Sequence, residues 1–357
     1  MKIGIVGAPN SGKTTIFNAL TRSATATTAY SSGQVEVHTA VVDVPDSRLE
    51  RLAQMFYPRK AVHAQVTYND IAGLTREIGS DGSIRGALLN AIAGNDALLL
   101  VARAFQDPNV PHPNNRIDPF ADLAAMETEF LLNDMVTVEG RLERIAAQKS
   151  RGQLEERQRM AREELLLARL YPLLEEGKHL RQTQLSVEEL KALGGFGFLS
   201  LKPLLRVVNA GDDDDESMYP DLMNAETFLL RGRLEADIAL MAPEEAADFL
   251  EEFGIAEQGL DRAIRRCYGV LGLISFFTIG DNEVRAWAVK AGSKAPEAAG
   301  VIHTDMQTGF IRAETIHFDS LMEAGSMAAA RSLGLLRLEG KEYVVQDGDI
   351  LNIRFNV

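Results

Sequence analysis

The chain has 357 residues, of which 46% are hydrophobic and 25% charged, and its formal net charge is −14. This length allows two or three domains with buried cores. The acidic balance excludes a protein that coats nucleic acid through its overall charge. No apolar run reaches the ~18 residues of a membrane-spanning helix, and the first residues lack the pattern of a secretion signal. The single cysteine, Cys267, excludes an internal disulfide and a cysteine-rich metal site, so we expect a cytoplasmic protein.

The first twenty residues contain the pattern around which the chain is organised. An apolar run at 3–6 predicts a buried strand, and residues 15–20 have helical spacing. Between them, residues 7–14 read GAPNSGKT, which fits the pattern G-x-x-x-x-G-K-[ST]. Glycines let successive backbone N–H groups point into one concavity, and the positive end of the following helix adds to the attraction for phosphate. The order of strand, loop and helix therefore predicts a nucleotide-binding α/β domain.

The loop residues have specific expected roles. Lys13 is expected to reach the β- and γ-phosphates, and the hydroxyl of Thr14 to ligate Mg²⁺. The remaining phosphate-binding positions are Asn10, Ser11, Gly12 and Thr15.

A second pattern follows about sixty residues later. A helix is predicted over 48–56, between strands predicted over 35–44 and 62–71. The later strand ends in Asp70-x-x-Gly73, at the carboxyl edge where ligands bind in open α/β sheets. Asp70 would hold the water shell of Mg²⁺, and the Gly73 N–H would meet the γ-phosphate. Residues 75–85, rich in glycine and charge, are interpreted as a switch that senses this phosphate.

The composition becomes helical after residue 120. Apolar residues recur at helical spacing on both sides of Gly152, which favours an antiparallel coiled-coil hairpin within residues 120–200. In the alternative interpretation, both helices pack on the sheet. Basic residues between 149 and 162 form either a solvated turn or a binding patch at the tip of the hairpin.

The sheet pattern resumes with a strand predicted over 203–208, which runs into Asn209-Ala210-Gly211-Asp212. Guanine-specific NTPases carry N-K-x-D here, where the aspartate accepts two hydrogen bonds from the base and the lysine packs along it. Asn209 and Asp212 fit this pattern, but Ala210 replaces the lysine. The residues alone therefore leave the choice between adenine and guanine open.

From residue 275 the pattern is that of a small α+β module. Strands are predicted over 275–279, 284–289, 312–316, 343–345 and 349–355, with one helix over 320–333. Strands around one helix in about eighty residues suggest a β-grasp domain over 275–357. The nucleotide domain is then expected to comprise residues 1–119 and 201–274, with 120–200 as an insertion.

Several longer stretches resemble one family, the YchF-type Obg-like ATPases. The stretches AWAVKAGSKAPEAAGVIHTDMQTGFIRAETI (286–316) and RLEGKEYVVQDGDILNIRFNV (337–357) are similar to the TGS domain of that family. The stretches NDIAGL (69–74) and RAF (103–105) are similar to its nucleotide domain. The resemblance spans nearly the whole chain. It implies a P-loop domain of Obg type, an inserted coiled-coil arm and a C-terminal TGS domain.

The resemblance also implies a function. It implies binding and slow hydrolysis of ATP rather than GTP, and a ribosome or another RNA-containing assembly as the partner. The base contacts would fall on Asn209 and the backbone of Ala210, with Phe105 against the face of the base. Asn10 matches the asparagine that in related NTPases helps to hold a potassium ion, and Leu74 stands where Ras-like enzymes have a water-orienting glutamine.

The chain departs from the family in both switch regions. Residues 30–46 keep only the final VPD of the first switch, and Thr39 lies near the position of a threonine that would close on Mg²⁺. Asp212 replaces a glutamate of the family, and its charge would suit guanine. These departures motivate two alternatives to a slow ATPase: a nucleotide-binding regulator with little or no hydrolysis, and a GTP-specific GTPase. The sequence favours a monomer without establishing the oligomeric state.

Overall fold

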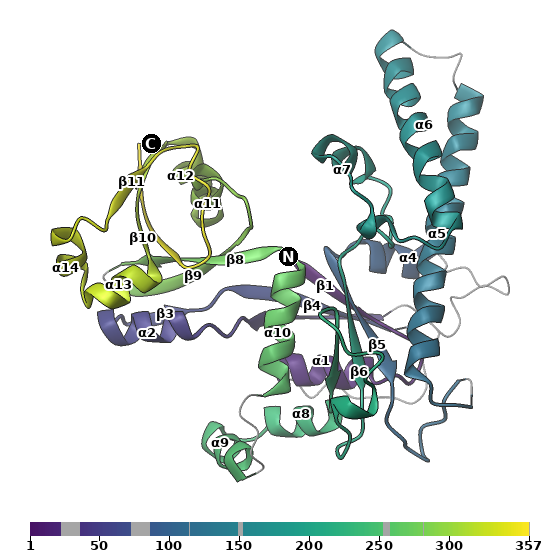
Figure 1. Cartoon of the computed structure of the whole chain (residues 1–357), viewed down its shortest axis with the longest axis horizontal. Helices are drawn as coiled ribbons and strands as arrows, with labels where there is room; N and C mark the ends of the chain where they lie inside the picture. The colour runs from purple at the N-terminus through teal and green to yellow at the C-terminus, as the bar shows by residue number, and fades with distance from the viewer. Residues whose placement is uncertain are drawn as a thin grey trace. The chain divides into compact units, whose positions relative to one another are not determined.

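The structure is a computed structural model that describes residues 1–22, 36–72, 86–113, 115–148, 153–252, 258–280 and 282–356. The chain divides into two compact units. The first unit consists of Met1–Ala40 and Tyr68–Leu260, and the second unit of Val41–Thr67 and Asp261–Val357. Figure 1 shows both units and labels their helices and strands where there is room.

A six-stranded sheet in the order β2-β4-β1-β5-β6-β7 runs through the first unit. The pairs β1–β5, β5–β6 and β6–β7 are parallel. All seven residues of β5 are buried, as expected for a central strand of a parallel sheet that is covered on both faces. The bounds are β1 Lys2–Val6, β2 Glu36–Asp43, β4 Gln65–Ala72, β5 Ala97–Arg103, β6 Leu204–Asn209 and β7 Thr227–Leu230.

Helices pack on this sheet. Helices α4 and α5 pack against it through a buried apolar cluster that includes Ile92, Leu100, Met126 and Phe130, and α1 packs against α8. The α-helices of this unit are α1 Lys13–Thr21, α4 Gly86–Ala93, α5 Pro119–Gln148, α6 Leu154–Glu175, α7 Val187–Leu193, α8 Gly232–Ala239 and α9 Pro243–Glu252. Two short 3-10 helices are η1 Leu180–Gln182 and η2 Glu216–Met218.

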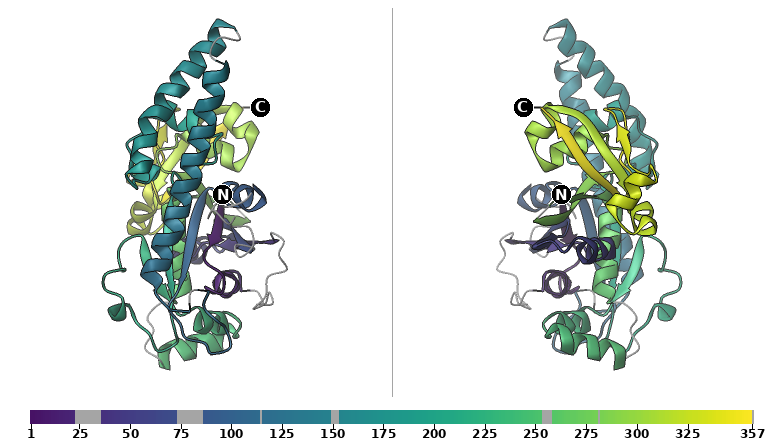
Figure 2. Two further views of the ribbon diagram at one scale, coloured as in Figure 1. Left: turned by 90° about the vertical axis from the view of Figure 1, so that its right-hand side faces the viewer. Right: turned by 90° about the vertical axis from the view of Figure 1, so that its left-hand side faces the viewer.

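The two longest helices, α5 and α6, form a helical hairpin and lie side by side (Figures 1 and 2). The first half of α5 contributes Met126 and Phe130 to the core on the sheet. Its second half contributes Val138 and Ile145 to a separate core shared with α6. The apolar residues of α5 therefore change partner along the helix, from the sheet in its first half to α6 in its second half.

A buried ionic cluster joins the base of this hairpin to the sheet. Glu127 of α5 accepts a hydrogen bond from the Arg206 Nε of β6 at 2.6 Å, and its other oxygen contacts Arg181 and, at 3.0 Å, His179. Burial alone would raise the pKa of Glu127, but the hydrogen bonds from His179 and Arg206 and the charges of Arg206 and Arg181 lower it to about 2. The cluster therefore holds Glu127 ionised between α5 and β6.

The second unit contains another six-stranded sheet, in the order β11-β10-β12-β8-β9-β3. The pairs β8–β9, β10–β11 and β10–β12 are antiparallel, whereas β12–β8 and β3–β9 are parallel. The strands are β3 Lys60–Val62, β8 Leu273–Ile279, β9 Glu283–Lys290, β10 Phe310–His317, β11 Arg337–Glu339 and β12 Asp349–Phe355. The helices are α2 Ser47–Phe56, α10 Gly259–Val270, α11 Ala295–Ile302, α12 Thr304–Thr308, α13 Phe318–Ala324 and α14 Met327–Ser332.

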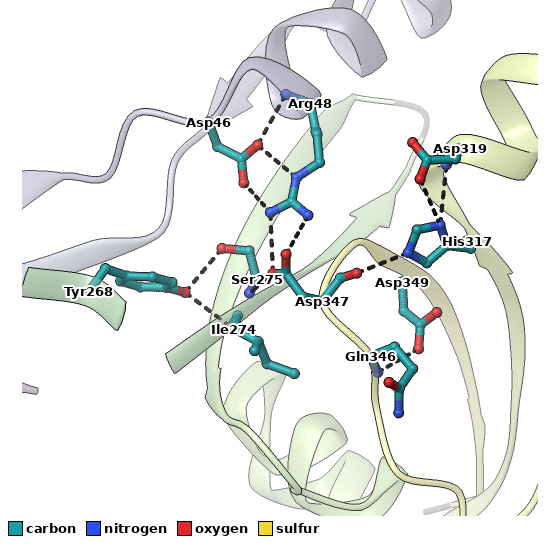
Figure 3. A network of polar contacts seen from close by, with 10 residues as sticks. All are labelled: Asp46, Arg48, Tyr268, Ile274, Ser275, His317, Asp319, Gln346, Asp347 and Asp349. Carbon is teal, nitrogen blue, oxygen red and sulfur yellow. Dashed lines mark hydrogen bonds and ion pairs between the residues drawn. The ribbon is translucent and has the colours of Figure 1, made fainter. Parts of the chain in front are cut away.

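Residues 41–67 belong to the second unit, although the sequence predicted them in the nucleotide domain. Strand β3 pairs with β9, and α2 packs against the same strand. Arg48 of α2 donates to both carboxylate oxygens of Asp347, at 2.7 and 3.2 Å, and its guanidinium lies 5.3 Å from the centre of the Phe277 ring (Figure 3 shows the polar contacts). These contacts join residues far apart in the sequence, which explains why local patterns did not predict them.

Other differences from the predicted elements are local. The strand predicted over 62–71 corresponds to β4, which begins at Gln65, and a separate short strand, β3, ends at Val62. The segment predicted as a strand over 343–345 makes only an isolated bridge from Val344 to Lys294. The helix predicted over 320–333 is two helices, because Gly325 adopts a φ of 74° and Ser326 caps the next helix through the N–H of Ala329.

Two features named from the composition can be located in the structure. In the part of the chain that the structure describes, no helix is both long and apolar enough to cross a membrane. Cys267 is buried in α10 with 1% of its surface exposed.

Candidate functional site

The loop after β1 has the backbone that its glycines allow. Gly7 has a φ of 155°, and an ideal Cβ there would lie 2.3 Å from the carbonyl oxygen of Val101. Gly12 has a φ of 87°, and its Cβ would lie 2.1 Å from the Nδ2 atom of Asn209. Any side chain at either position would collide with its neighbour, so the close approach of the loop to β5 and β6 requires glycine.

Lys13 begins helix α1 directly after this turn. Its Nζ donates hydrogen bonds to the carbonyl oxygens of Gly7 at 3.0 Å and Ala8 at 2.8 Å, so the side chain folds back over the loop. Burial lowers the pKa of Lys13 to about 8, and the negative charge of Asp70 opposes this shift. The first turn of α1 has no acidic residue and no side-chain cap, which leaves its N–H groups suited to an anion.

The hydroxyl of Thr14 meets the carboxylate that the second pattern predicts. Thr14 Oγ1 donates to Asp70 Oδ2 at 2.7 Å, and Asp70 of β4 has 0% of its surface exposed. Burial raises the pKa of Asp70, while the hydrogen bond from Thr14 and the charge of Lys13 oppose this shift. Among the described residues, the other carboxylate oxygen, Oδ1, is buried without a hydrogen-bond partner. An unpartnered buried oxygen of this kind is one that a further ligand would satisfy.

This donor set fits Mg²⁺. The Thr14 hydroxyl and the Asp70 carboxylate are hard oxygen donors, and Mg²⁺ commonly takes one or two protein oxygens together with waters and phosphate oxygens. No cluster of three or more histidine, cysteine, aspartate or glutamate side chains suited to a metal is found in the described ranges. The residues thus suit a metal that arrives with a phosphate ligand rather than one enclosed by protein alone.

A row of amide side chains lies beside Asp70. Thr39 of β2 donates its hydroxyl to Asn69 Oδ1 at 2.8 Å, and Asn69 Nδ2 donates to Asn95 Oδ1 at 2.7 Å. Thr39, noted in the sequence for its position near the first switch, therefore bonds to the residue that precedes Asp70. The row connects β2 with β4 next to the candidate metal ligands.

Asn209 lies at the end of β6 and connects the loop to a neighbouring helix. It is 3% exposed, its Nδ2 donates to the carbonyl oxygen of Ser11 at 3.0 Å, and its Oδ1 accepts from the N–H of Gly232 at 3.2 Å. The backbone N–H of Phe105 donates to the carbonyl oxygen of Asn209 at 3.1 Å, and Ala210 N–H donates to Leu230 at 2.9 Å. The structure therefore places the predicted base-side residues Asn209 and Phe105 beside the loop.

The remaining predicted residues lie in different surroundings. Asp212 is exposed on the turn after β6, and its carbonyl oxygen accepts from Arg231 at 3.3 Å. Asn10 donates its Nδ2 to the carbonyl oxygen of Pro111 at 2.9 Å, and Thr15 lies partly exposed in the first turn of α1. Gly73, the predicted switch over 75–85 and the hairpin tip at 149–152 lie outside the described residues.

Two further features had no role assigned from the sequence. His112 follows Pro111 and bonds through Nε2 to Asp122 of α5 at 3.0 Å, with both side chains buried. Arg103, the last residue of β5, is 2% exposed and lies over the ring of Phe105. A charged residue at the end of a buried strand was the available signal for Arg103, whereas no periodic pattern connects His112 with Asp122.

Comparison with known proteins places this geometry in a family. A protein from Bacillus subtilis strain 168 named "Ribosome-binding ATPase YchF" is 39% identical, with 99% of each chain covered. The chain belongs to the YchF family. A protein of the same name from Escherichia coli O157:H7 is 36% identical over 100% of this chain and 99% of its own, and "Obg-like ATPase 1" from rice is 35% identical over 100% and 92%.

Family models and a solved structure agree with this assignment. A family model described as a 50S ribosome-binding GTPase matches residues 2–139, and the YchF GTPase C-terminal model, described as a protein of unknown function, matches residues 273–356. The structure of the Schizosaccharomyces pombe YchF GTPase matches with a TM-score of 0.84 at 31% identity, covering 99% of this chain and 97% of that one. The predicted fold, a P-loop nucleotide domain followed by the C-terminal domain of this family, is confirmed.

Proposed function

We propose that this protein is a Mg²⁺-dependent nucleotide switch that binds ATP, hydrolyses it slowly and signals the bound state to the ribosome or an RNA-associated partner. The observation that carries the proposal is the convergence of Lys13, Thr14 and Asp70 on one glycine-bounded loop. Relatives that match over almost their whole length are named ribosome-binding ATPases, which supports ATP as the nucleotide and the ribosome as the partner. A ribosomal partner in turn supports a cytoplasmic location.

The roles of the residues follow from their present contacts. The loop N–H groups and the Lys13 ammonium would bind the phosphates, with Lys13 exchanging its two loop carbonyls for phosphate oxygens. Thr14 and Asp70 would hold Mg²⁺, Asp70 through water. When bound, the metal ion would neutralise charge that develops on the transferred phosphoryl group. Gly73 would sense the γ-phosphate through its N–H.

Base recognition would depend on the end of β6 and on Phe105. Because the Ala210 N–H already donates to Leu230, the backbone group that this residue would offer a base is its carbonyl oxygen. A carbonyl accepts from the 6-amino group of adenine, whereas guanine presents another acceptor at that position. Asn209 would act by holding the loop, since its amide bonds to Ser11 and Gly232. Phe105 would lie against the face of the base.

The rest of the chain would report the nucleotide state. The helical hairpin is joined to β6 through the contact of Glu127 with Arg206, and Asn209, which bonds to the phosphate loop, ends that strand. The hairpin, proposed as a coiled-coil arm over 120–200, and the C-terminal domain, proposed as a TGS domain over 275–357, would contact the partner. The Nδ2 of Asn10 donates to the carbonyl oxygen of Pro111, so the side-chain oxygen of Asn10 would be the atom that helps to hold a potassium ion.

Two other functions remain candidates on particular observations. Little or no hydrolysis is favoured by Leu74, because it offers no polar group to orient water where Ras-like enzymes have glutamine. GTP specificity is favoured by Asp212, whose exposed carboxylate could accept hydrogen bonds from guanine.

Hydrolysis of ATP by the purified full chain tests the proposal. Lys13→Ala and Thr14→Ala should each lower kcat/KM by about 100-fold or more, because each removes a group that stabilises phosphoryl charge. Thr21→Ala is the matched control, since Thr21 lies at the other end of α1 and its hydroxyl bonds within the helix to Phe17. This variant should hydrolyse ATP at the wild-type rate.

The outcomes separate the candidates. Hydrolysis by Lys13→Ala at the wild-type rate would overturn the site. A wild-type protein that binds ATP without turnover, with and without K⁺, would establish the non-hydrolysing regulator. Preferential turnover of GTP would establish the GTPase.

A further inference from the structure

Arg103 is a buried charged residue at the end of β5, next to the candidate base site. Its Nε donates to the carbonyl oxygen of Phe105 at 3.1 Å, and its Nη2 reaches the carbonyl oxygen of Asp107 at 3.5 Å. Within the described residues, Nη1 is buried without a hydrogen-bond partner. Burying a guanidinium with one group unpartnered costs stability. A functional role for Arg103 would explain why the fold tolerates that cost.

The Arg103 guanidinium lies over one face of the Phe105 ring, with its central carbon 4.4 Å from the ring centre. The ring edge is turned to the phosphate loop, since Cε1 lies 3.5 Å from an ideal Cβ on Gly12. The Phe105 ring is half-buried, and the backbone N–H of Phe105 donates a hydrogen bond to the carbonyl oxygen of Asn209 at 3.1 Å. With one face covered by Arg103, the opposite face is the one that can receive a planar ligand.

We propose that Arg103 is a positioning residue for nucleotide binding, whose guanidinium fixes the Phe105 ring so that the opposite ring face stacks on the purine base. The inference rests on the proposed function and adds a residue that acts through Phe105 without touching the nucleotide. A cation on the ring face and a hydrogen bond to the Phe105 carbonyl restrict both the side chain and the backbone of this residue. Binding the base then costs less ordering of the protein.

Two ligands separate the contribution of the base to binding from that of the phosphates. ATP carries both groups, whereas inorganic tripolyphosphate carries only the phosphates that the loop would bind. Arg103→Gln should weaken ATP binding by about 3- to 10-fold, the range of a partly desolvated cation–π contact. It should leave tripolyphosphate binding within about twofold of wild type, because the Lys13 side of the loop is unchanged. Titration calorimetry with Mg²⁺ measures both affinities.

A double-mutant cycle tests whether Arg103 acts through the ring. Phe105→Leu should weaken ATP binding by itself, and adding Arg103→Gln to it should have no further effect. Arg103→Lys keeps a cation but loses the planar group and should show an intermediate loss. The matched control is Arg285→Gln, because Arg285 lies 4.3 Å from the centre of the Trp287 ring in the second unit and should not affect ATP binding.

Three results would overturn the inference. Equal losses for ATP and tripolyphosphate would mean that Arg103 supports the phosphate loop. Additive losses in the double variant would mean that Arg103 acts independently of Phe105. Wild-type affinity for ATP in Arg103→Gln would mean that the ring needs no support. If wild-type protein bound tripolyphosphate but no ATP, the proposed function itself would fail, which the wild-type titration shows separately. Arg103→Lys and Phe105→Leu keep the test decisive if Arg103→Gln does not fold.

Discussion

Replacing Glu127 by glutamine should loosen the connection between the helical hairpin and β6. Glu127 is 9% exposed and contacts His179 and two arginines, of which Arg206 lies in β6 itself. A pKa lowered from 4.5 to about 2 corresponds to about 3 kcal/mol of folding free energy. Glutamine keeps the shape but removes the counter-charge of Arg181 and one of the two carboxylates that pair with Arg206, so a loss of about 3 kcal/mol is expected.

The pH dependence follows from the sign of this shift. Because the pKa of Glu127 is lower in the folded protein, its contribution is fully present above the unfolded value of 4.5 and is lost as the pH falls toward 2. The stability difference between wild type and Glu127→Gln should therefore be complete at pH 7. It should shrink below about pH 4.5, because the Glu127 carboxylate of the unfolded chain becomes protonated there while that of the folded chain stays ionised until about pH 2.

Hydrogen exchange of the intact chain measures this effect locally. At pH 7, amides of α5 and β6 that exchange when the contact between these two elements opens locally should exchange about 100-fold faster in Glu127→Gln. Glu163→Gln is the control, because Glu163 pairs with Arg141 farther along the hairpin, and its loss should cost about 1 kcal/mol. Exchange in β6 that is no faster in Glu127→Gln than in Glu163→Gln would refute the assigned role of the cluster.

Gly12→Ala should weaken ATP binding by at least about tenfold, because its φ is 87° and a Cβ would displace Asn209. Gly177 also has a positive φ, of 78°, but open space around it, so Gly177→Ala should leave ATP affinity unchanged. Equal ATP affinities of the two variants by calorimetry would contradict the requirement for glycine in the phosphate loop. Arg48→Met should destabilise the second unit by about 2 kcal/mol, since it loses an ion pair with Asp347 and a ring contact. Urea unfolding, followed by the fluorescence of the sole tryptophan, measures this loss of stability. The control is Arg51→Met, which removes only a ring contact to Phe318 and should cost less than about 1 kcal/mol.

The phosphate loop could be predicted from the sequence because all of its determinants are local. Gly7, Gly12 and Lys13 lie within one octet, and the flanking apolar residues have the periods of a strand and a helix. The proximity of Asp70 to Thr14 could also be predicted from the sequence, because Asp70 lies at the carboxyl end of a predicted strand.

Contacts between distant segments could not be predicted in the same way. Arg48 and Asp347 are 299 residues apart, so no local period connects residues 41–67 with the second unit. The side-chain amide of Asn209 bonds to Ser11 and to Gly232, which requires the end of β6, the phosphate loop and the start of α8 to lie together. The division of the helix predicted over 320–333 was available in principle, since Gly325-Ser326 combines a helix end signal with a capping residue.

Titration calorimetry of the purified protein with ATP and with GTP, both with Mg²⁺, tests the central claim most directly. The account predicts ATP binding with a Kd on the order of micromolar and GTP binding at least about tenfold weaker. It also predicts that Lys13→Ala loses most of the ATP affinity. Tighter binding of GTP would show that Asp212 outweighs the backbone of Ala210, and the absence of binding by either nucleotide would contradict the site itself.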